Sequence, residues 1–419
     1  MKKSSAGASL LLIFVGFTVM APADRLWATT PQDVTWKWQL PALKSDGSLW
    51  RWRRTPVQVV GDNKSVSAGC SHTVTLKYDG TLWAWGWNLL GSLGDGTNIG
   101  TNTPVQVRSG NTWVSVSAGG FYTVGLKSDG TLWAWGYNGD GQLGDGTNTR
   151  TNTPVQVGSE SDWVSVEAGI LHTLALKSDM TLWAWGGNLF GSLGDGTTTD
   201  RNTPVQIGTD SKWVSAEAGV SYTVALKSDG TLWAWGWNSY GQLGDGTCTD
   251  RNTPVQVGSD NTWVSISAGG WHTLALKTDG TLWAWGFNGE GQLGNGTYTR
   301  TNTPVQVGND NSWISVSAGG HHSVALKSDG TLWAWGDNAE GQLGDGTNTD
   351  RNTPVQVESD SKWVSVSAGG FYTVGLKADG TLWAWGDNAE GQLGDGTNTD
   401  KTLPKRISPL IRTADFDGE

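Results

Sequence analysis

The stretch Thr81-Leu-Trp-Ala-Trp-Gly86 returns unchanged at Thr131, Thr181, Thr231, Thr281, Thr331 and Thr381, each time after 50 residues. An altered copy, Ser48-Leu-Trp-Arg-Trp52, lies upstream. A strict period of this length is typical of repeat architectures in which each unit is one supersecondary element. Length alone would suggest two or three domains for 419 residues, but the period predicts one continuous array.

Each unit is predicted to form four short strands. In the second unit Val114 to Gly119 alternates and ends in small residues, and Tyr122 to Leu126 forms a second run. Asp129-Gly130 then predicts a hairpin turn before the third run, Thr131 to Gly136. A polar segment leads to the fourth run, Pro154 to Val157, where an initial proline suits an edge strand. With 61 Gly and 28 Trp, the composition also favours short strands and tight turns.

Four antiparallel strands repeated seven times predict an all-β fold, a β-propeller with seven four-stranded blades. Each unit has two apolar faces that only its neighbours can cover, so the units must occur as an array. The upstream remnant leaves an eight-bladed ring as the alternative, and a solenoid is the other repeat architecture considered. Met180 replaces the glycine of the hairpin turn, so we expect another turn type there.

The chain divides into five segments by composition. Residues 1–23 have a basic start, an apolar stretch from Leu10 to Met20 and an Ala21-Pro-Ala23 cleavage site, which together predict a signal peptide. Ala28 is a second possible cleavage point. Residues 24–41 form an N-terminal segment, 42–63 a partial repeat with a possible role in ring closure, 64–407 the seven repeats and 408–419 a tail. We therefore expect an exported protein, extracellular, periplasmic or at the cell surface.

The charge of the chain limits the kinds of partner that it can bind, and its two cysteines limit the disulfides that it can form. A formal charge of −11 disfavours binding to nucleic acid or anionic membranes. Cys70 and Cys248 lie in distant repeats at non-equivalent positions, so a disulfide between them is not expected. We expect a monomer, not inserted in a membrane once the signal is cleaved.

Variation between the repeats concentrates in two loops that the strand order places on one face: the loop after Ala118-Gly119 and the loop after Trp135-Gly136. Many aromatic residues occur there, which is the composition of binding hot spots. The predicted partner-binding residues are Trp87, Phe121, Tyr137, Phe190, Trp237, Tyr240, Trp271, Phe287, His321 and Phe371. The later repeats add acids, Asp337, Glu340, Asp387 and Glu390. The alternative is that these rings pack between loops and cap the blades.

No catalytic, cofactor or metal site is predicted. His72, His172, His272 and His322 share a position that holds tyrosine in the other repeats, which favours a hydrogen-bonding role over metal ligation. Only His321-His322 beside Asp337 suggests a local metal pair. The Gly-Asp-Gly-Thr loops lack the spaced ligands of known calcium motifs, so calcium binding there is a weak alternative. No nucleophile elbow, phosphate-binding loop or zinc spacing occurs.

Several motifs of the unit carry a family resemblance. Ser117-Ala-Gly119, Leu126-Lys-Ser-Asp-Gly130, Leu132 to Asn138 and Gly141-Gln-Leu-Gly-Asp-Gly146 resemble the regulator of chromosome condensation repeat, over roughly residues 42–407. Departures are minor: Met180, Asn295 for Asp, and Ser92 and Ser192 for Gln. The resemblance implies a propeller that is normally seven-bladed.

The family's founding eukaryotic members are guanine-nucleotide exchange factors that use a wedge inserted in the propeller, and they also bind chromatin. The unbroken 50-residue spacing leaves no room for such an insertion. We therefore expect a secreted, non-enzymatic protein-binding propeller or scaffold. Exchange activity, an enzyme inhibitor, a glycan-binding propeller and a hydrolase or lectin using the central funnel are the alternatives, beside a structural array with little selectivity.

Overall fold

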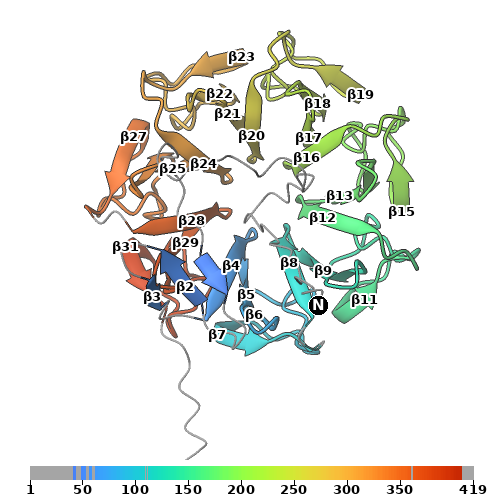
Figure 1. Cartoon of the computed structure of the whole chain (residues 1–419), viewed down its shortest axis with the longest axis horizontal. Helices are drawn as coiled ribbons and strands as arrows, with labels where there is room; N and C mark the ends of the chain where they lie inside the picture. Colours follow the sequence, from blue (N-terminus) through green and yellow to red (C-terminus); the bar gives the residue numbers. More distant parts are fainter. Residues whose placement is uncertain are drawn as a thin grey trace, which may run out of the picture. The chain divides into compact units, whose positions relative to one another are not determined.

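The computed structural model describes residues 41–43, 49–52, 56–58, 62–108, 110, 112–359 and 362–407. Within residues 62–407 there are seven four-stranded antiparallel sheets, arranged as blades around a central channel (Figure 1). The chain runs once around the ring, so the first blade lies beside the seventh (Figure 1). No helix occurs in the described ranges. The prediction of an all-β, seven-bladed propeller is confirmed, and the eight-bladed alternative is wrong.

Each blade is one contiguous stretch of chain. Blades 1 and 2 consist of β4 (Asn63–Ala68), β5 (His72–Lys77), β6 (Leu82–Gly86), β7 (Thr101–Gln106), β8 (Trp113–Ala118), β9 (Tyr122–Lys127), β10 (Leu132–Gly136) and β11 (Thr151–Gln156). Blades 3 and 4 consist of β12 (Trp163–Ala168), β13 (His172–Lys177), β14 (Leu182–Gly186), β15 (Arg201–Gln206), β16 (Trp213–Ala218), β17 (Tyr222–Lys227), β18 (Leu232–Gly236) and β19 (Arg251–Gln256).

Blades 5 to 7 repeat the same order, with the first strand of each blade innermost (Figure 1). They consist of β20 (Trp263–Ala268), β21 (His272–Lys277), β22 (Leu282–Gly286), β23 (Thr301–Gln306), β24 (Trp313–Ala318), β25 (His322–Lys327), β26 (Leu332–Gly336), β27 (Arg351–Val357), β28 (Trp363–Ala368), β29 (Tyr372–Lys377), β30 (Leu382–Gly386) and β31 (Lys401–Arg406).

The upstream remnant forms its own three-stranded antiparallel sheet, β1 (Pro41–Leu43), β2 (Leu49–Trp52) and β3 (Pro56–Gln58), in a unit separate from the ring. Among the described strands, the seventh blade takes its fourth strand from β31 and none from this sheet. The proposed signal peptide, the 24–40 segment and the tail after residue 407 lie outside the described residues. The segment boundaries stay predictions.

The hydrophobic core lies between the blades. One cluster joins Val124 and Leu132 of blade 2 to Trp163, Val166 and Trp185 of blade 3. An equivalent cluster joins blade 7 to blade 1 and closes the ring. The second strand of each blade is almost continuously buried, because it lies in the middle of its sheet and is covered on both faces. Each blade thus depends on its neighbours for burial, as the array argument predicts.

The third-strand tryptophans are the largest fully buried side chains, and each indole Nε1 is held by the preceding blade. Trp185 is fully buried, and its Nε1 donates to the carbonyl of Gln142 in the preceding blade, 2.9 Å away. A Cβ on Gly144 would lie 2.5 Å from the same Nε1, and the φ of Gly144 is +71°. Glycine is therefore required at this position both by the close approach of the indole and by the backbone conformation.

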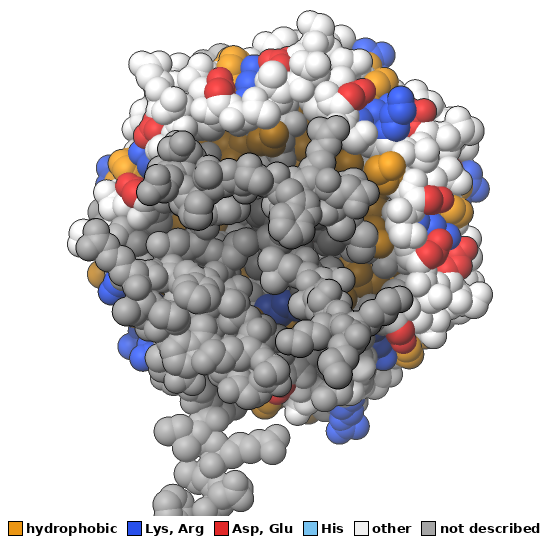
Figure 2. All heavy atoms as spheres, in the orientation of Figure 1, with side chains coloured by type: hydrophobic (Ala, Val, Ile, Leu, Met, Phe, Trp, Pro, Cys, Tyr) orange, Lys and Arg blue, Asp and Glu red, His pale blue; other side chains and the backbone are white. Residues whose placement is uncertain are grey.

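A second tryptophan of each blade packs under a lysine. The Nζ of Lys227 lies 3.9 Å from the ring centre of Trp233 and 4.7 Å from that of Trp213, and it pairs with Asp210 at 2.6 Å. This combines a cation–π contact with an ion pair at the ends of the strands. Figure 2 shows one face of the molecule, where oppositely charged side chains lie close together around the rim and hydrophobic ones lie nearer the centre.

Candidate functional site

The two variable loops of each blade are joined by a main-chain hydrogen bond. The amide of Phe287 donates to the carbonyl of Trp271 at 2.9 Å, and the amide of Asp337 donates to that of His321 at 3.1 Å. The same bond links Trp87 to Ser71, Tyr137 to Phe121, Gly187 to Leu171, Trp237 to Ser221 and Asp387 to Phe371. Both loops therefore lie at the same end of every blade, and their variable residues form one face of the ring.

Seven of the ten predicted residues form a continuous series of ring contacts, which we name the aromatic arc: Phe190, Trp237, Tyr240, Trp271, Phe287, His321 and Phe371. Ring centres lie 5.8 Å apart for Phe190 and Trp237, 5.4 Å for Trp237 and Tyr240, and 4.9 Å for Tyr240 and Phe287. Trp271 lies 5.7 Å from Phe287 and 4.6 Å from His321, edge to face. His321 stacks on Phe371 at 6.1 Å with 12° between the planes. The arc thus crosses blades 3 to 7.

The remaining three predicted residues lie elsewhere on this face. Trp87 and Phe121 form a separate pair whose ring centres are 5.0 Å apart. Tyr137 lies beside Asp140, and burial together with that carboxylate raises the pKa of the Tyr137 phenol. In blade 3 a glycine, Gly187, occupies the position of Trp87 and Tyr137, so the arc begins only at Phe190.

The rings of the arc are half-buried, except Phe371, which is 43% exposed. They pack against one another as well as presenting edges to solvent. The contacts support the interpretation that the aromatics pack over the ends of their blades, and the partner-binding interpretation stays a prediction. Such packing also holds the rings in fixed positions, which lowers the entropy cost of binding.

Three buried polar atoms in or beside the arc lack a hydrogen-bond partner among the described residues: Nε1 of Trp271, Nδ1 of His321 and Oε2 of Glu290. His321 Nδ1 and Glu290 Oε2 are 3.8 Å apart, too long for a hydrogen bond but close enough for an ion pair if the imidazole is protonated. Atoms of this kind also occur at repeated core positions of the other blades, such as Nε1 of Trp163 and Trp213, so they do not by themselves mark a functional site.

An acidic patch adjoins the arc on blades 6 and 7, made of Asp337, Glu340, Asp387 and Asp400. Burial raises the pKa of Glu340, and the charges of Asp400, Asp387 and Asp337 raise it further. The neighbouring cations are used elsewhere: Arg351 pairs with Asp345 at 2.8 Å and Lys401 with Asp395 at 3.5 Å. The patch therefore keeps a concentrated negative charge.

The histidines and tyrosines at the start of the second strands connect neighbouring blades. Nε2 of His172 lies 3.0 Å from Oγ1 of Thr223, and the hydroxyl of Tyr122 donates to the carbonyl of His172 at 2.6 Å. Burial lowers the pKa of His72 and His172 to about 4, so both are neutral in the fold. Among the described residues no group of three His, Cys, Asp or Glu side chains is placed to hold a metal ion.

The Gly-Asp-Gly-Thr loops are closed by internal donors. Asp195 accepts hydrogen bonds from the amide and hydroxyl of Thr197, and its second oxygen accepts two from Arg201. Asp145 likewise accepts from the amide and hydroxyl of Thr147. These hydrogen bonds form Asx and Ser/Thr turns within the loops.

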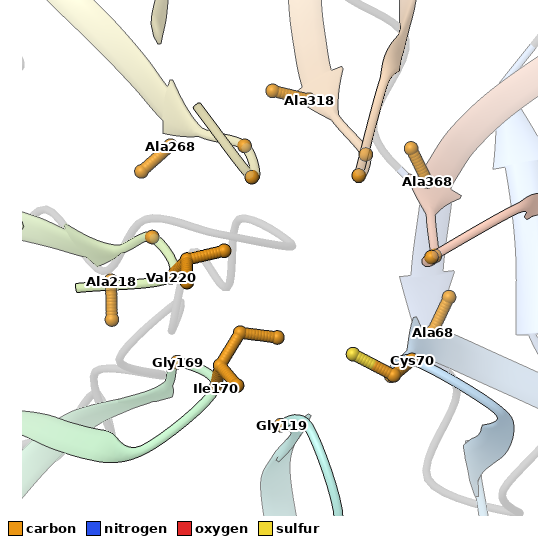
Figure 3. Close-up of a pocket in the computed structure, with 18 of the residues that line it drawn as sticks. Ala68, Cys70, Gly119, Gly169, Ile170, Ala218, Val220, Ala268, Ala318 and Ala368 are labelled. Atoms are coloured by element: carbon orange, nitrogen blue, oxygen red, sulfur yellow. The ribbon is translucent and has the colours of Figure 1, made fainter. Parts of the chain in front are cut away.

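The Ala-Gly loops surround a cavity of about 130 Å³ on the axis of the ring. Its wall is almost entirely Ala and Gly, with Cys70, Ile170 and Val220 projecting inward (Figure 3). Burial raises the pKa of the Cys70 thiol to about 11, so it stays protonated. Cys70 and Cys248 are both free thiols, as predicted. With so few polar groups, this cavity offers little to orient a ligand.

Sequence reasoning missed two glutamates on the innermost strands, Glu167 of β12 and Glu217 of β16. In the other five blades this position is serine, and Ser67, Ser117, Ser267, Ser317 and Ser367 each accept a hydrogen bond from an alanine amide of the next blade. Burial raises the pKa of Glu167 to about 7, while burial and the charge of Glu167 raise that of Glu217. Ser117 donates to Glu167 at 3.0 Å. Comparing the repeats position by position would have revealed these two residues, because they are charged at an otherwise uncharged strand position.

None of the described segments forms a helix long and apolar enough to cross a membrane.

Comparison with known proteins agrees with this architecture. The family model described as an RCC1-like domain matches residues 43–320 and 160–416. Yeast RCC1 (Prp20), solved bound to Kap60, is similar with 25% identity and a TM-score of 0.72, covering 79% of this chain and 84% of that one. No curated protein sequence matches the chain significantly.

Two further solved structures show the same fold. Prp20p from Saccharomyces cerevisiae, whose structure was reported with its binding to Gsp1p and histones, has 24% identity and a TM-score of 0.72, covering 84% of this chain and 88% of that one. Human WBSCR16 has 22% identity and a TM-score of 0.71, covering 78% of this chain and 94% of that one. With the family model spanning nearly all of the repeat region, the chain belongs to the RCC1-like domain family of β-propellers.

Proposed function

We propose that this protein is a secreted, non-enzymatic propeller that binds a protein partner through the aromatic arc. The observation that carries the proposal is a coincidence of two properties. The residues that differ between otherwise near-identical repeats are also the ones that contact one another across blades 3 to 7.

The composition of the arc supports the same proposal. Trp and Tyr are enriched at binding hot spots because they bury a large area and lose little conformational freedom. The solved relative yeast RCC1 (Prp20) was crystallised with a protein, Kap60, so a propeller of this family can serve as a protein-binding surface. Export rests on the N-terminal features of residues 1–23, which the sequence alone provides.

The test is a triple substitution, Trp237→Ala, Tyr240→Ala and Trp271→Ala, used as bait beside the wild-type protein in the extracellular fraction of the producing organism. We expect capture of the partner to fall roughly 30-fold or more, since hot-spot truncations typically cost about 2 kcal/mol or more. Thermal unfolding would show that the variant is folded.

A matched control removes three exposed apolar side chains at the start of innermost strands in blades 3 to 5. Val164, Val214 and Val264 are 42%, 42% and 44% exposed. Each follows a tryptophan whose amide donates to the hairpin turn of the preceding blade, at Gly130, Met180 and Gly230, which lies at the opposite end of the blade from the arc. Changing all three to Ser should leave capture intact. Equal capture by the arc variant and the wild type would show that the partner binds elsewhere.

Guanine-nucleotide exchange is the second candidate, because the 25% identity to yeast RCC1 extends over most of both chains. The uninterrupted 50-residue spacing of the repeats argues against it, since family resemblance places the exchange activity on an inserted wedge. Release of a fluorescent GDP analogue from a small GTPase distinguishes the two functions. We expect no acceleration by this protein, and a catalytic acceleration would favour exchange.

A further inference from the structure

We propose that the partner presents a cationic, apolar segment to this face, with arginine or lysine side chains over blades 6 and 7 and apolar side chains along the arc. The inference rests on the proposed function and specifies the chemistry of its ligand. It arises from the arrangement of aromatic rings and carboxylates in consecutive loops of the same blades.

The acidic patch directly continues the arc. Asp337 is bonded through its amide to the carbonyl of His321, and Asp387 in the same way to Phe371, at 3.1 and 3.0 Å. His321 and Phe371 are the two stacked rings at the end of the arc. A guanidinium can lie flat on an aromatic ring while donating to a carboxylate, so this junction suits arginine in particular.

Local hydrogen bonds do not neutralise the patch. Asp337 accepts from the amide of Ala339, and Asp387 accepts from the amide of Ala389 and the side chain of Gln392. These donors are uncharged, so they fix the carboxylates in place without cancelling their charge. Asp400 similarly accepts from the amide of Asn388. Four carboxylates held this close favour any ligand that brings positive charge.

A positive charge lies in the middle of the arc, at blades 4 and 5. Arg300 reaches from blade 5 to the loop of blade 4, where its guanidinium donates to the carbonyl of Ser239 at 3.0 Å. Ser239 lies between the arc residues Trp237 and Tyr240. A partner is therefore expected to place its basic residues at blades 6 and 7 and away from Arg300.

The unpartnered atoms of the arc fit a peptide ligand as well. Nε1 of Trp271 and Oε2 of Glu290 offer one donor and one acceptor at the arc. A main chain carries donors and acceptors in alternation, which could satisfy both atoms. The extent of the arc across five blades also suits an extended segment better than a small cation.

The experiment is selection of a phage-displayed library of random dodecapeptides on the full chain, with three variants in parallel. The first is the arc variant defined above. The second is Asp337→Asn, Glu340→Gln and Asp387→Asn, in which each amide keeps an acceptor oxygen for the loop hydrogen bonds. The third removes the same charge from the opposite face by Asp162→Asn, Asp210→Asn and Asp260→Asn, whose carboxylates pair with lysines there.

We expect the enriched peptides to combine Lys or Arg with Trp, Phe or Leu. The second variant should bind the best peptide about ten-fold more weakly, as expected for losing several partly exposed ion pairs, and added salt should weaken binding to the wild type. The third variant should bind normally. The inference would be overturned if the peptides that require the arc had no excess of basic residues, or if they bound the second variant as tightly as the wild type. Either result would leave the proposed function standing. No arc-dependent enrichment at all would overturn both.

Discussion

A single position at the start of each second strand links every blade to the next. It holds histidine in four blades and tyrosine in three, and in both cases the polar group at the end of the ring reaches the neighbouring blade. The two side chains are interchangeable here because each places a flat ring in the core and a hydrogen-bonding atom at its far edge. Only histidine, however, gains a proton between pH 5 and 8 once the chain is unfolded.

We expect the variant His272→Tyr to resist acid better than the wild type. Burial, with smaller contributions from His321 and His322, lowers the pKa of His272 to about 3, while the unfolded chain takes up a proton near 6.5. The unfolded state therefore binds more protons below pH 6.5, and stability falls as the pH drops towards 3. Removing this group should recover roughly 1.4 kcal/mol for each pH unit below 6.5.

Urea unfolding of the two proteins at pH 7 and pH 4.5 would measure this difference. Three blades of the ring have tyrosine at this position and are each followed by a blade that has histidine there. The blade that contains His272 is also followed by a blade with histidine at this position, His322. The substitution should therefore be accommodated. An equal loss of stability in both proteins on acidification would contradict the assigned role of His272.

The glutamate at position 217 should have the reverse effect. Its pKa is raised in the fold, so the folded state holds the proton more tightly than the unfolded chain, and stability falls as the pH rises above about 4.5. Glu217→Ser should stabilise the protein at pH 8 and have less effect at pH 4. Serine would also supply a hydrogen-bond acceptor for the next blade, as Ser267 does for the amide of Ala318.

Thermal unfolding across this pH range would test that expectation, with Glu217→Gln as the control that removes the charge without restoring the serine contact. Greater stability of Glu217→Ser than of Glu217→Gln at all pH values would measure the hydrogen bond alone. A Glu217→Ser variant that is less stable than the wild type at pH 8 would contradict the cost assigned to the buried charge.

At the scale of strands and turns, the structure corrects two expectations. The fourth strands begin three residues earlier than predicted: β11 starts at Thr151, not at Pro154, because Thr151 pairs with Gly136 across a bulge that the proline leaves in the ladder. The fourth strand is nevertheless an edge strand, as the proline indicated. The expectation of a different turn at Met180 is wrong.

Met180 keeps the same turn as its glycine counterparts. Its φ is +64°, and its amide donates to the carbonyl of Lys177 at 2.9 Å, as the amide of Gly130 does to Lys127 at 3.0 Å. The turn is retained because the flanking strands β13 and β14 pair in the same register as in every other blade. The packing of the blade therefore overrides the backbone preference of methionine.

We expect Met180→Gly to stabilise the protein by up to about 1 kcal/mol. The left-handed conformation costs a non-glycine residue roughly 1–2 kcal/mol, and the substitution removes this cost. Part of the benefit is lost because glycine gives up more backbone entropy on folding. Chemical denaturation would measure the change. Gly130→Met, the converse substitution in blade 2, is the matched comparison and should destabilise. An unchanged or lowered stability of Met180→Gly would show that the methionine side chain makes compensating contacts.

At the scale of the whole ring, closure depends on non-covalent contacts. No described strand is shared between the first and last blades, so the junction has no chain connection of its own. The contacts there are nevertheless the usual ones: Thr73 donates to the hydroxyl of Tyr372, and Nε1 of Trp85 donates to the carbonyl of Gln392 at 2.8 Å. The seventh junction thus has the packing of the other six without their covalent link.

Native-state hydrogen exchange should therefore show that opening begins at this junction. Amides of β4 and β28 are expected to exchange faster than those of the equivalent strands β12 and β16, because a blade at the junction can separate from one neighbour without breaking the chain's continuity. Uniform protection of all innermost strands would contradict this and would indicate that the ring opens only by global unfolding.

The period of 50 residues, the hairpin turns and the alternating runs were enough to predict the blades, their number and the face on which variable residues gather. These are local or repeated properties, and each repeat supplies the same information again. The sequence could not show which variable residues would touch. Phe190 and Trp237 lie 47 positions apart and make contact only because consecutive blades are rotated about a common axis.

The sequence by itself therefore determined the repeat unit and its array, because strand periodicity and turn chemistry act over a few residues and need no knowledge of distant contacts. Only the tertiary structure decided that seven rings join into one arc while Trp87, Phe121 and Tyr137 lie outside it. It alone also placed Glu167 and Glu217 together on the inner strands and held Met180 in a left-handed turn. In each case the outcome depends on packing between blades, where one repeat provides the environment of the next.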